Sequence, residues 1–352
     1  MKKISSTQKN SIKKIKTTDV VPCFFGVIEK KDGEDTVVIL INKNEERPCS
    51  VTKSYFTEYD NQQSMNFKIT SSCSRETDPN FVTIEKEVVL ELPPGRPAGQ
   101  EVKVTYSFDD NGLMQASVKD VESGKVIDLE ISKTGGTESE SSSIDRFTVD
   151  TEPKTESNKI GAFVGIHLGT TYSGISYIDE NGSPKIINNS EGENITPSCI
   201  LIEGDTVIVG EEARKELGIS DNVLARFKRH MGEKGKKYEV DGKEYTPTDC
   251  SSLVLKKLFQ DAQKEIGEIG DAVVTIPANF TNKARTATIT AAELAGLEIK
   301  NIVDEPTAAA LYYAFKGGVT LNGQYAVYDL GGGTFDISII NVTQKKDKQD
   351  ID

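Results

Sequence analysis

Two glycine-rich segments constrain the fold of this chain more than any other feature. One is GIHLGTTYSGISY from Gly165, and the other is YDLGGGTFDISII from Tyr328. In each, apolar residues alternate on both sides of a tip of small residues, which predicts a strand, a turn and a returning strand. Glycines at such tips let backbone N–H groups approach phosphate oxygens, and threonine hydroxyls add donors. Either segment alone could be an ordinary glycine-rich hairpin, but the two together predict a clamp for a polyphosphate.

The region around these segments, residues 160–352, alternates short apolar strands such as AFVGIHLG and AVVTIP with helices. Such alternation is typical of an α/β unit. One helix is predicted in SSLVLKKLFQDAQKEIG, where apolar residues fall on one face at helical spacing. These residues are Leu255, Leu258, Phe259, Ala262 and Ile266.

An all-β unit is predicted over residues 19–133, where short β-rich segments are separated by turn residues. Its clearest element is a hairpin in EVKVTYSFDDNGLMQASV, with a tight turn at Asn111 and Gly112. The hairpin residues that alternate toward one face are Val102, Val104, Tyr106, Phe108, Met114, Ala116 and Val118. A basic flexible arm is expected over residues 1–18, and a flexible linker rich in Ser, Thr and Glu over residues 134–159.

Composition excludes several classes of function. The formal net charge of −13 gives no electrostatic attraction to nucleic acid or to an anionic membrane, so neither is expected as a partner. The five cysteines are widely spaced and never form a CxxC motif, which favours free thiols in a reducing compartment. No apolar run suits a secretory signal or a membrane span, so a cytoplasmic location is expected. Walker, Rossmann, GxSxG and HExxH motifs are absent from the sequence.

Five segments, taken in order, carry a family resemblance. GIHLGTTYS, FKRHMG, VVTIPANF, IVDEPTAAALYYA and VYDLGGGTFDISI resemble segments of the actin-like ATPase domain of the heat shock protein 70 family. The resemblance covers residues 160–345 and implies ATP and Mg²⁺ as cofactors. It also implies an actin-like (ribonuclease H-like) nucleotide-binding fold, represented by a first lobe and the first hairpin of a second lobe.

The resemblance implies roles for individual residues. The residues expected to contact the phosphates are Gly169, Thr170, Thr171, Tyr172, Gly331, Gly332, Gly333 and Thr334. Lys228 would place its ammonium group near the γ-phosphate and the attacking water, where it would stabilise negative charge. Glu305, Asp329 and Asp336 would be the acidic groups of the site, with Asp329 holding Mg²⁺ indirectly through water.

Two further residues match positions that relay the nucleotide state to the neighbouring domain in the family, namely Pro277 and Arg285. Simpler interpretations exist for the residues that carry charge. A single lysine such as Lys228 is ordinarily a solvated surface charge, and Glu305 followed by Pro306 is ordinarily a helix N-terminal signal. Only the motif context favours the functional interpretation over these.

The all-β region also resembles this family. TDVVPCFFGVIE, ILINKNEERP, YFTEYDNQQSMNFKI and ELPPGRPAGQEVKVTYSFDDNGLMQASVKDVESGK resemble, in order, the β-sandwich that binds extended peptides. By this resemblance Tyr55 and Met65 would line the peptide groove, with Val27 and Ile28 nearby. An equally weighted alternative is that these four residues fill the core of the sandwich, because alternating apolar residues in strands usually do.

Three departures from the family pattern shape the functional prediction. The family places the ATPase domain first, whereas here the predicted sandwich precedes it. His167 replaces the aspartate of GIDLGTT, and an imidazole cannot supply the carboxylate that helps to hold hydrated Mg²⁺. The sequence supplies only the first hairpin of the second lobe, so a truncated nucleotide-binding domain is expected.

The resemblance predicts a stress-response chaperone that uses ATP for protein folding and binds unfolded or extended peptides, with ATP hydrolysis impaired. The protein partners that it implies are J-domain co-chaperones and nucleotide exchange factors. Two alternatives stay open: a peptide-binding module with a degenerate, non-hydrolysing nucleotide domain, and an inactive rearranged fragment. A sugar kinase of the same superfamily is a more distant alternative, because DLGGGTFD and VDEPTAAA point to the chaperone branch.

Overall fold

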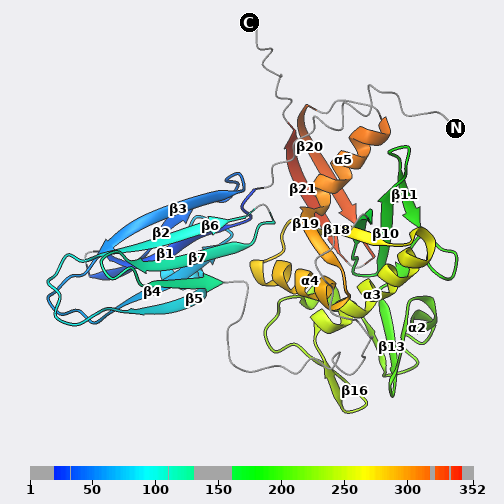
Figure 1. Ribbon diagram of the computed structural model, residues 1–352, viewed down its shortest axis with the longest axis horizontal. Coiled ribbons are helices and arrows are strands. Elements are labelled where there is room, and N and C mark those ends of the chain that lie inside the picture. The colour runs from blue at the N-terminus through cyan, green and yellow to red at the C-terminus, as the bar shows by residue number, and fades with distance from the viewer. Residues whose placement is uncertain are drawn as a thin grey trace, which may run out of the picture. The chain divides into compact units, whose positions relative to one another are not determined.

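The computed structural model describes residues 20–31, 33–109, 111–130, 161–317, 322–332 and 334–342. The predicted basic arm and the predicted linker lie outside these residues. The chain divides into two compact units, one formed mainly by residues 18–139 and the other mainly by residues 140–352. The first unit runs from blue to cyan in Figure 1, and the second from green to red.

The first unit is a β-sandwich of two four-stranded antiparallel sheets (Figure 1). The first sheet has the order β2 (Glu34–Ile41), β1 (Phe24–Lys31), β4 (Ser64–Ser72), β5 (Thr83–Glu91). The second sheet has the order β3 (Cys49–Phe56), β6 (Glu101–Phe108), β7 (Met114–Asp120), β8 (Val126–Glu130). A short 3₁₀ helix, η1 (Pro79–Phe81), precedes β5.

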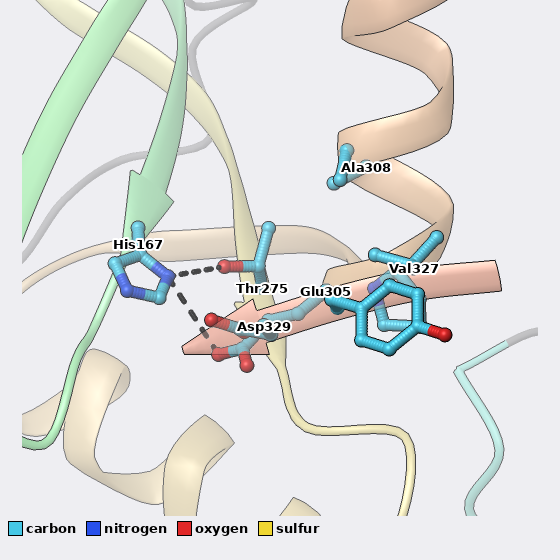
Figure 2. Close-up of a pocket in the computed structure, with 9 residues that line it drawn as sticks. His167, Thr275, Glu305, Ala308, Val327 and Asp329 are labelled. Atoms are coloured by element: carbon cyan, nitrogen blue, oxygen red, sulfur yellow. Dashed lines mark hydrogen bonds and ion pairs between the residues drawn. The ribbon is translucent and has the colours of Figure 1, made fainter. Parts of the chain in front are cut away.

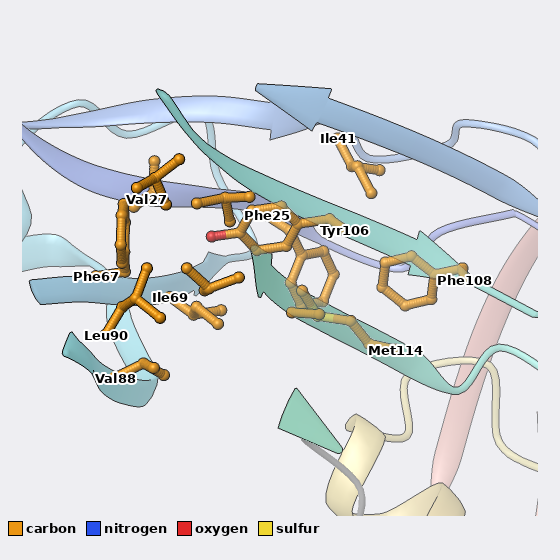
Figure 3. Packing of buried hydrophobic residues seen from close by; sticks show 14 of the residues in the cluster. Phe25, Val27, Ile41, Phe67, Ile69, Val88, Leu90, Tyr106, Phe108 and Met114 are labelled. Atoms are coloured by element: carbon orange, nitrogen blue, oxygen red, sulfur yellow. The ribbon is translucent and has the colours of Figure 1, made fainter. Parts of the chain in front are cut away.

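Alternate residues of both sheets fill the core of the sandwich (Figure 3). Val27 and Ile69 from the first sheet and Tyr106 from the second are buried there. The rings of Phe25 and Phe108 pack edge to face, with their centroids 5.0 Å apart. Successive residues of a strand point to opposite faces of the sheet. The apolar residues of the alternating pattern therefore lie on the buried face of each sheet, and the polar residues between them lie on the solvent-facing side.

The predicted hairpin is confirmed as β6 and β7, which pair in antiparallel register with Val104 opposite Val118. All of its predicted inward-facing residues are buried: Val102, Val104, Tyr106, Phe108, Met114, Ala116 and Val118. Between the strands, Gly112 has a φ of 71°, a left-handed conformation that glycine adopts without steric penalty.

The second unit is built on a six-stranded mixed sheet (Figure 1). Its order is β11-β10-β9-β18-β19, and the short strand β12 pairs with β10. The strands are β9 (Ala162–His167), β10 (Tyr172–Ile178), β11 (Pro184–Ile187), β12 (Thr196–Pro197), β18 (Ile269–Ile276) and β19 (Glu298–Asp304). β10 is antiparallel to β9 and β11, whereas β18 runs parallel to β9 and β19.

The main helices of this unit are α3 (Pro247–Ile266), α4 (Asn282–Leu294) and α5 (Glu305–Gly317). The predicted helix is confirmed in α3, whose residues Leu255, Leu258 and Ala262 are buried. α3 begins with a capping box, in which Thr246 and Asp249 each accept the other's backbone N–H through a side-chain oxygen. Within the described residues, no helix is long and apolar enough to cross a membrane.

Smaller elements complete the second unit. A three-stranded sheet has the order β14 (Thr206–Val209), β13 (Cys199–Glu203), β15 (Val223–Ala225). The others are α2 (Glu211–Lys215), the 3₁₀ helix η3 (Phe227–His230), the pair β16 (Tyr238–Val240) and β17 (Lys243–Tyr245), and the hairpin β20 (Gly323–Leu330) and β21 (Phe335–Val342).

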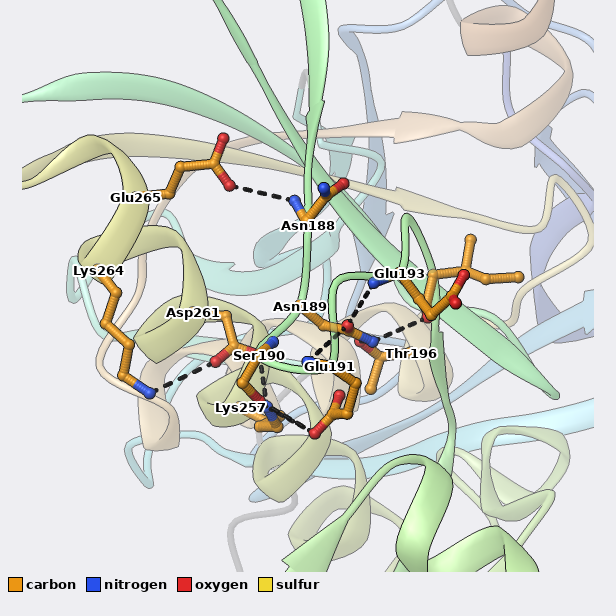
Figure 4. A network of polar contacts seen from close by, with 11 residues as sticks. Asn188, Asn189, Ser190, Glu191, Glu193, Thr196, Lys257, Asp261, Lys264 and Glu265 are labelled. Carbon is orange, nitrogen blue, oxygen red and sulfur yellow. Dashed lines mark hydrogen bonds and ion pairs between the residues drawn. The ribbon is translucent and has the colours of Figure 1, made fainter.

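A polar network fixes the loop that leads into β12 (Figure 4). The side-chain oxygen of the buried Asn189 accepts the backbone N–H groups of Glu191 at 3.1 Å and Glu193 at 2.8 Å. Lys257 of α3 donates to the hydroxyl of Ser190 in the same loop. The network therefore positions β12, which pairs with the start of β10 directly after the first glycine-rich turn.

Candidate functional site

The first glycine-rich turn joins β9 to β10 and requires a glycine at position 169. An added Cβ on Gly169 would lie 1.9 Å from the backbone oxygen of Tyr172, far inside van der Waals contact. The two strands are in register, with His167 opposite Gly174. The turn thus places the side chain of His167 at the end of β9, beside the tip.

Two buried serines hold this turn in place. Ser173 Oγ accepts the N–H of Gly169 at 3.1 Å and lies 2.8 Å from Ser198 Oγ. Ser198 Oγ donates to the carbonyl of Gly169 at 2.8 Å, and its backbone N–H donates to the carbonyl of Thr171 at 2.8 Å. These serines were not identified from the sequence, because Ser198 reaches the turn only through the pairing of β12 with β10.

The second glycine-rich turn joins β20 to β21 and meets the first turn directly. It is closed by a hydrogen bond from the N–H of Gly331 to the carbonyl of Thr334, at 2.9 Å. An added Cβ on Gly332 would lie 2.5 Å from Thr171 Oγ1, so the tips of the two turns are in contact. Among the described residues, the buried hydroxyl oxygen of Thr171 has no hydrogen-bond partner. Gly333, also predicted to bind phosphate, lies outside the described residues.

Beside the turns lies a cavity with a volume of about 330 Å³ (Figure 2). It is lined by His167, Thr275, Glu305, Pro306, Ala308, Ala309, Val327, Tyr328 and Asp329. These residues come from the ends of β9 and β18, from the first turns of α5, and from β20. The cavity therefore brings together three residues of the predicted site: His167, Glu305 and Asp329.

His167 points toward β18 and α5 in Figure 2. Its Nδ1 atom lies 3.1 Å from Thr275 Oγ1 and 3.6 Å from Glu305 Oε1. Desolvation lowers the pKa of His167 below its ordinary value of 6.5, and this outweighs the opposing attraction of the Glu305 carboxylate. About half of the imidazole surface, 51%, stays exposed to solvent, which limits how far desolvation lowers this pKa. The neutral form therefore predominates at pH 7.

Lys228 forms a buried ion pair with Glu305. It lies on η3, and its Nζ atom donates to Glu305 Oε1 at 2.9 Å. The two side chains are only 6% and 13% exposed. The ammonium group also lies 5.6 Å from the ring centroid of Phe280, within the range of a cation–π interaction. Lys228 is thus not a solvated surface charge.

Glu305 is the first residue of α5, so its carboxylate lies at the positive end of the helix dipole. Glu305 is therefore both a helix-start residue, as the simpler interpretation has it, and a residue of the cavity wall.

Asp336 lies opposite Asp329 in the β20–β21 register rather than on the cavity wall. Pro277 directly follows β18 and Arg285 lies within α4, and neither lines the cavity.

The four residues predicted to bind peptide lie in the sandwich, but they do not share one surface. Val27 is 1% exposed and belongs to the core, whereas Ile28, the next residue of β1, points to the opposite face. Tyr55 and Met65 are half-buried and pack against the core. For Val27, the alternative that it is a core residue fits this geometry better.

Tyr55 links the two sheets of the sandwich. Its ring packs edge to face on Phe67 with the centroids 5.3 Å apart, and its hydroxyl donates to Glu29 Oε1 at 2.7 Å. Burial, together with the hydrogen bond to Glu29, raises the pKa of Tyr55. This role of Glu29 was not predicted from the sequence, because a carboxylate in a strand of alternating pattern is usually solvated.

The donor groups of the site fit a phosphate better than a metal ion. The unpartnered hydroxyl of Thr171 and the ammonium group of Lys228 are groups that bind phosphate oxygens. Among the described residues, no group of three or more His, Cys, Asp and Glu side chains is arranged to hold a metal ion. His167 offers nitrogen where hydrated Mg²⁺ prefers oxygen, so the groups on the cavity wall that could hold a hydrated Mg²⁺ are the carboxylates of Glu305 and Asp329.

The fold and the site are compatible with a multidomain protein that contains an α/β ATPase unit. A family model described as Hsp70 protein matches residues 3–161 and 163–346. The chain therefore belongs to the Hsp70 family. Family membership suggests an ATP-binding chaperone, because the family in general binds ATP with Mg²⁺, unfolded peptides and co-chaperones.

Proposed function

We propose that this chain is an ATP-binding and peptide-binding chaperone in which ATP hydrolysis is impaired. The layout that we infer is a peptide-binding sandwich followed by an ATP-binding α/β unit. One observation carries the proposal: Thr171 and Gly332 bring the two glycine-rich turns together around an unpartnered hydroxyl group.

The unpartnered hydroxyl of Thr171 supports phosphate binding at the turns. A buried polar group without a partner costs about 1–3 kcal/mol, and a phosphate oxygen accepting its proton would remove that cost. Because the turns are in contact, a phosphate group enters only after they separate. Lys228 would then supply a buried cation beside the phosphates, exchanging part of its interaction with Glu305 for one with the ligand.

His167 supports the impairment of hydrolysis. Its ring lies between Thr275 and Glu305, on the wall of the cavity beside the turns. The mainly neutral imidazole supplies neither a carboxylate for a hydrated cation nor a full positive charge for the phosphates. Charge that develops on the phosphates during hydrolysis is therefore poorly stabilised at this position.

The substitution His167→Asp tests the proposal. It should raise the single-turnover rate of ATP hydrolysis by the full chain about tenfold or more, since one electrostatic group of an active site often contributes about 10²–10³ to the rate. His167→Asn is the matched control, because it has a similar size to aspartate but no charge, and its rate should stay low. An aspartate variant that binds ATP but hydrolyses it no faster than the wild type would contradict the role of His167.

The sandwich is the proposed peptide-binding unit. Tyr55 and Met65 support this assignment because their side chains pack against the apolar core but stay partly exposed. A side chain of an extended peptide could insert against such a partly exposed apolar surface. The substitution Met65→Gln should weaken the binding of a fluorescently labelled extended apolar peptide about tenfold, which corresponds to about 1.4 kcal/mol.

Fluorescence anisotropy with the full chain measures this affinity, and the melting temperature checks that the variant folds. Val89→Ser is the control, because Val89 is exposed on the outer surface of the same sheet. Its peptide affinity should equal that of the wild type. If no extended apolar peptide binds to the wild-type chain, the peptide-binding part of the proposal is wrong.

A further inference from the structure

Two cysteines face each other at one end of the sandwich, outside the ATP site and the proposed peptide site. Cys23 directly precedes β1, and Cys73 directly follows β4. The register of these strands pairs Phe24 with Ser72, so Cys23 lies opposite Cys73 one step farther along. Their Sγ atoms are 3.6 Å apart.

This position suits a disulfide. Residues directly opposite each other in antiparallel strands have Cα atoms roughly 4.5–5.5 Å apart. That separation falls inside the range of roughly 4.4–6.8 Å seen for the Cα atoms of disulfide-bonded cysteines. Small rotations of the two side chains are therefore enough to bring the sulfur atoms to bonding distance.

We propose that Cys23 and Cys73 are a redox modification site that forms a disulfide with a small-molecule disulfide, such as oxidised glutathione, as the oxidant. The thiolate of Cys73 attacks the oxidant, which forms a mixed disulfide and releases one molecule of glutathione. The thiolate of Cys23 then attacks the sulfur of Cys73 and releases the second glutathione. The protein loses two electrons and two protons, and the two glutathione molecules receive them.

The surroundings of the thiols set the order of these steps. Cys73 is exposed and can meet the oxidant, whereas Cys23 is half-buried. Burial, together with the hydrogen bond to Cys73, raises the pKa of Cys23 to about 11, so this thiol is the slower one to react with an oxidant in solution. Cys199 and Cys250 are buried, and burial raises the pKa of each, which disfavours both as sites of oxidation.

The disulfide would join the residue before β1 to the residue after β4 and close a loop that contains the four strands β1 to β4. A cross-link of this kind restricts the unfolded chain more than the folded one, because the two cysteines are already adjacent in the folded sheet. We therefore expect oxidation to raise the melting temperature of the sandwich by about 5–10 °C.

The test uses the full reduced chain, incubated with excess oxidised glutathione, denatured and alkylated with N-ethylmaleimide. Intact mass should show five adducts before oxidation and three after it, because the chain has five cysteines. Peptide mapping without reduction should find one cross-linked pair, between Cys23 and Cys73. Five remaining adducts, or a bond that involves Cys49, would overturn the proposal.

Two variants complete the test. Cys73→Ser should keep all four of its thiols after the same treatment and should show no rise in melting temperature. Cys49→Ser is the matched control, because Cys49 is a half-buried thiol of the same sandwich, and it should still form the bond. A rise in the melting temperature of the oxidised Cys73→Ser variant would show that stabilisation comes from elsewhere and would overturn the proposal.

Discussion

At the scale of single residues, the candidate site depends on a small set of charges. Lys228 and Glu305 are buried together at 2.9 Å, and the neutral His167 lies 3.6 Å from the same carboxylate oxygen. Burying one of these charges without its partner is costly, whereas the pair together is tolerated. The effects of substituting Lys228 and Glu305 on the free energy of unfolding, and on ligand binding, should therefore be coupled rather than additive.

This coupling gives a prediction for Lys228→Met. Removing one partner of a buried ion pair should lower the free energy of unfolding by about 3–5 kcal/mol, because it leaves the other charge without compensation. The double variant Lys228→Met with Glu305→Gln should lose much less than the sum of the two single variants. Urea unfolding followed by circular dichroism measures these values, since the chain has no tryptophan.

Additive effects in this double-mutant cycle would contradict the coupling. The matched control is the exposed pair Lys215 and Glu212, whose nitrogen and oxygen atoms are 2.6 Å apart. Exposed pairs contribute about 0–1 kcal/mol, so Lys215→Met should change the free energy of unfolding by less than about 1 kcal/mol. A loss of several kcal/mol in the Lys215→Met variant would mean that solvent exposure does not determine how strongly these ion pairs stabilise the fold.

At the scale of elements, the first glycine-rich turn is the most tightly constrained part of the site. Gly169 is crowded by the backbone of Tyr172, and Ser173 and Ser198 bond both its N–H and its carbonyl group. Since backbone atoms cannot move aside as a flexible side chain can, a Cβ at this position forces the turn to change shape. The conformation of the turn and the position of Thr171 depend on this glycine.

The substitution Gly169→Ala should therefore destabilise the α/β unit by about 1–3 kcal/mol, the usual cost of inserting a group into a packed region. Gly174→Ala is the matched control in the same hairpin, because its added Cβ would meet its nearest atom, the backbone oxygen of Asn194, at an ordinary 3.5 Å. Thermal unfolding compares the two variants. Equal melting temperatures would contradict the account of the turn.

Elements with a local sequence pattern were predictable, and contacts between distant elements were not. The β6–β7 hairpin and helix α3 follow from their residue periodicity, and the structure confirms both. The pairing of Lys228 with Glu305 joins residues 77 positions apart, and no periodicity specifies it. The same limit applies to Thr275, which becomes a neighbour of His167 only because β18 pairs with β9.

The sequence pattern of the sandwich left an ambiguity that the packing resolves for one residue. Alternating apolar residues are expected both in a core and along a peptide groove, so Val27 and Tyr55 could not be told apart by pattern. Val27 is buried between the sheets, whereas Tyr55 is half-buried and its hydroxyl bonds to Glu29. The difference arises from the position of each strand in the sandwich, which a single-sequence pattern does not encode.

At the scale of the whole molecule, the chain combines a β-sandwich unit and an α/β unit within one member of the Hsp70 family. The function that we propose requires the α/β unit to bind ATP with a histidine, His167, rather than a carboxylate at the end of β9. With one carboxylate fewer for a hydrated cation, we expect the hydroxyl and backbone donors at the turns to supply more of the interaction with the phosphates. Thr171 is the donor for which the structure gives the clearest indication.

Isothermal titration of the full chain with ATP, using wild-type protein, Thr171→Val and Thr206→Val, tests this claim most directly. Valine keeps the shape of threonine but removes the hydroxyl, and Thr206 is an exposed residue of β14 that serves as the control. We predict saturable binding to the wild type, affinity about tenfold weaker for Thr171→Val, equivalent to about 1.4 kcal/mol, and no change for Thr206→Val. Absence of ATP binding to the wild type, or equal affinity of all three proteins, would contradict the account.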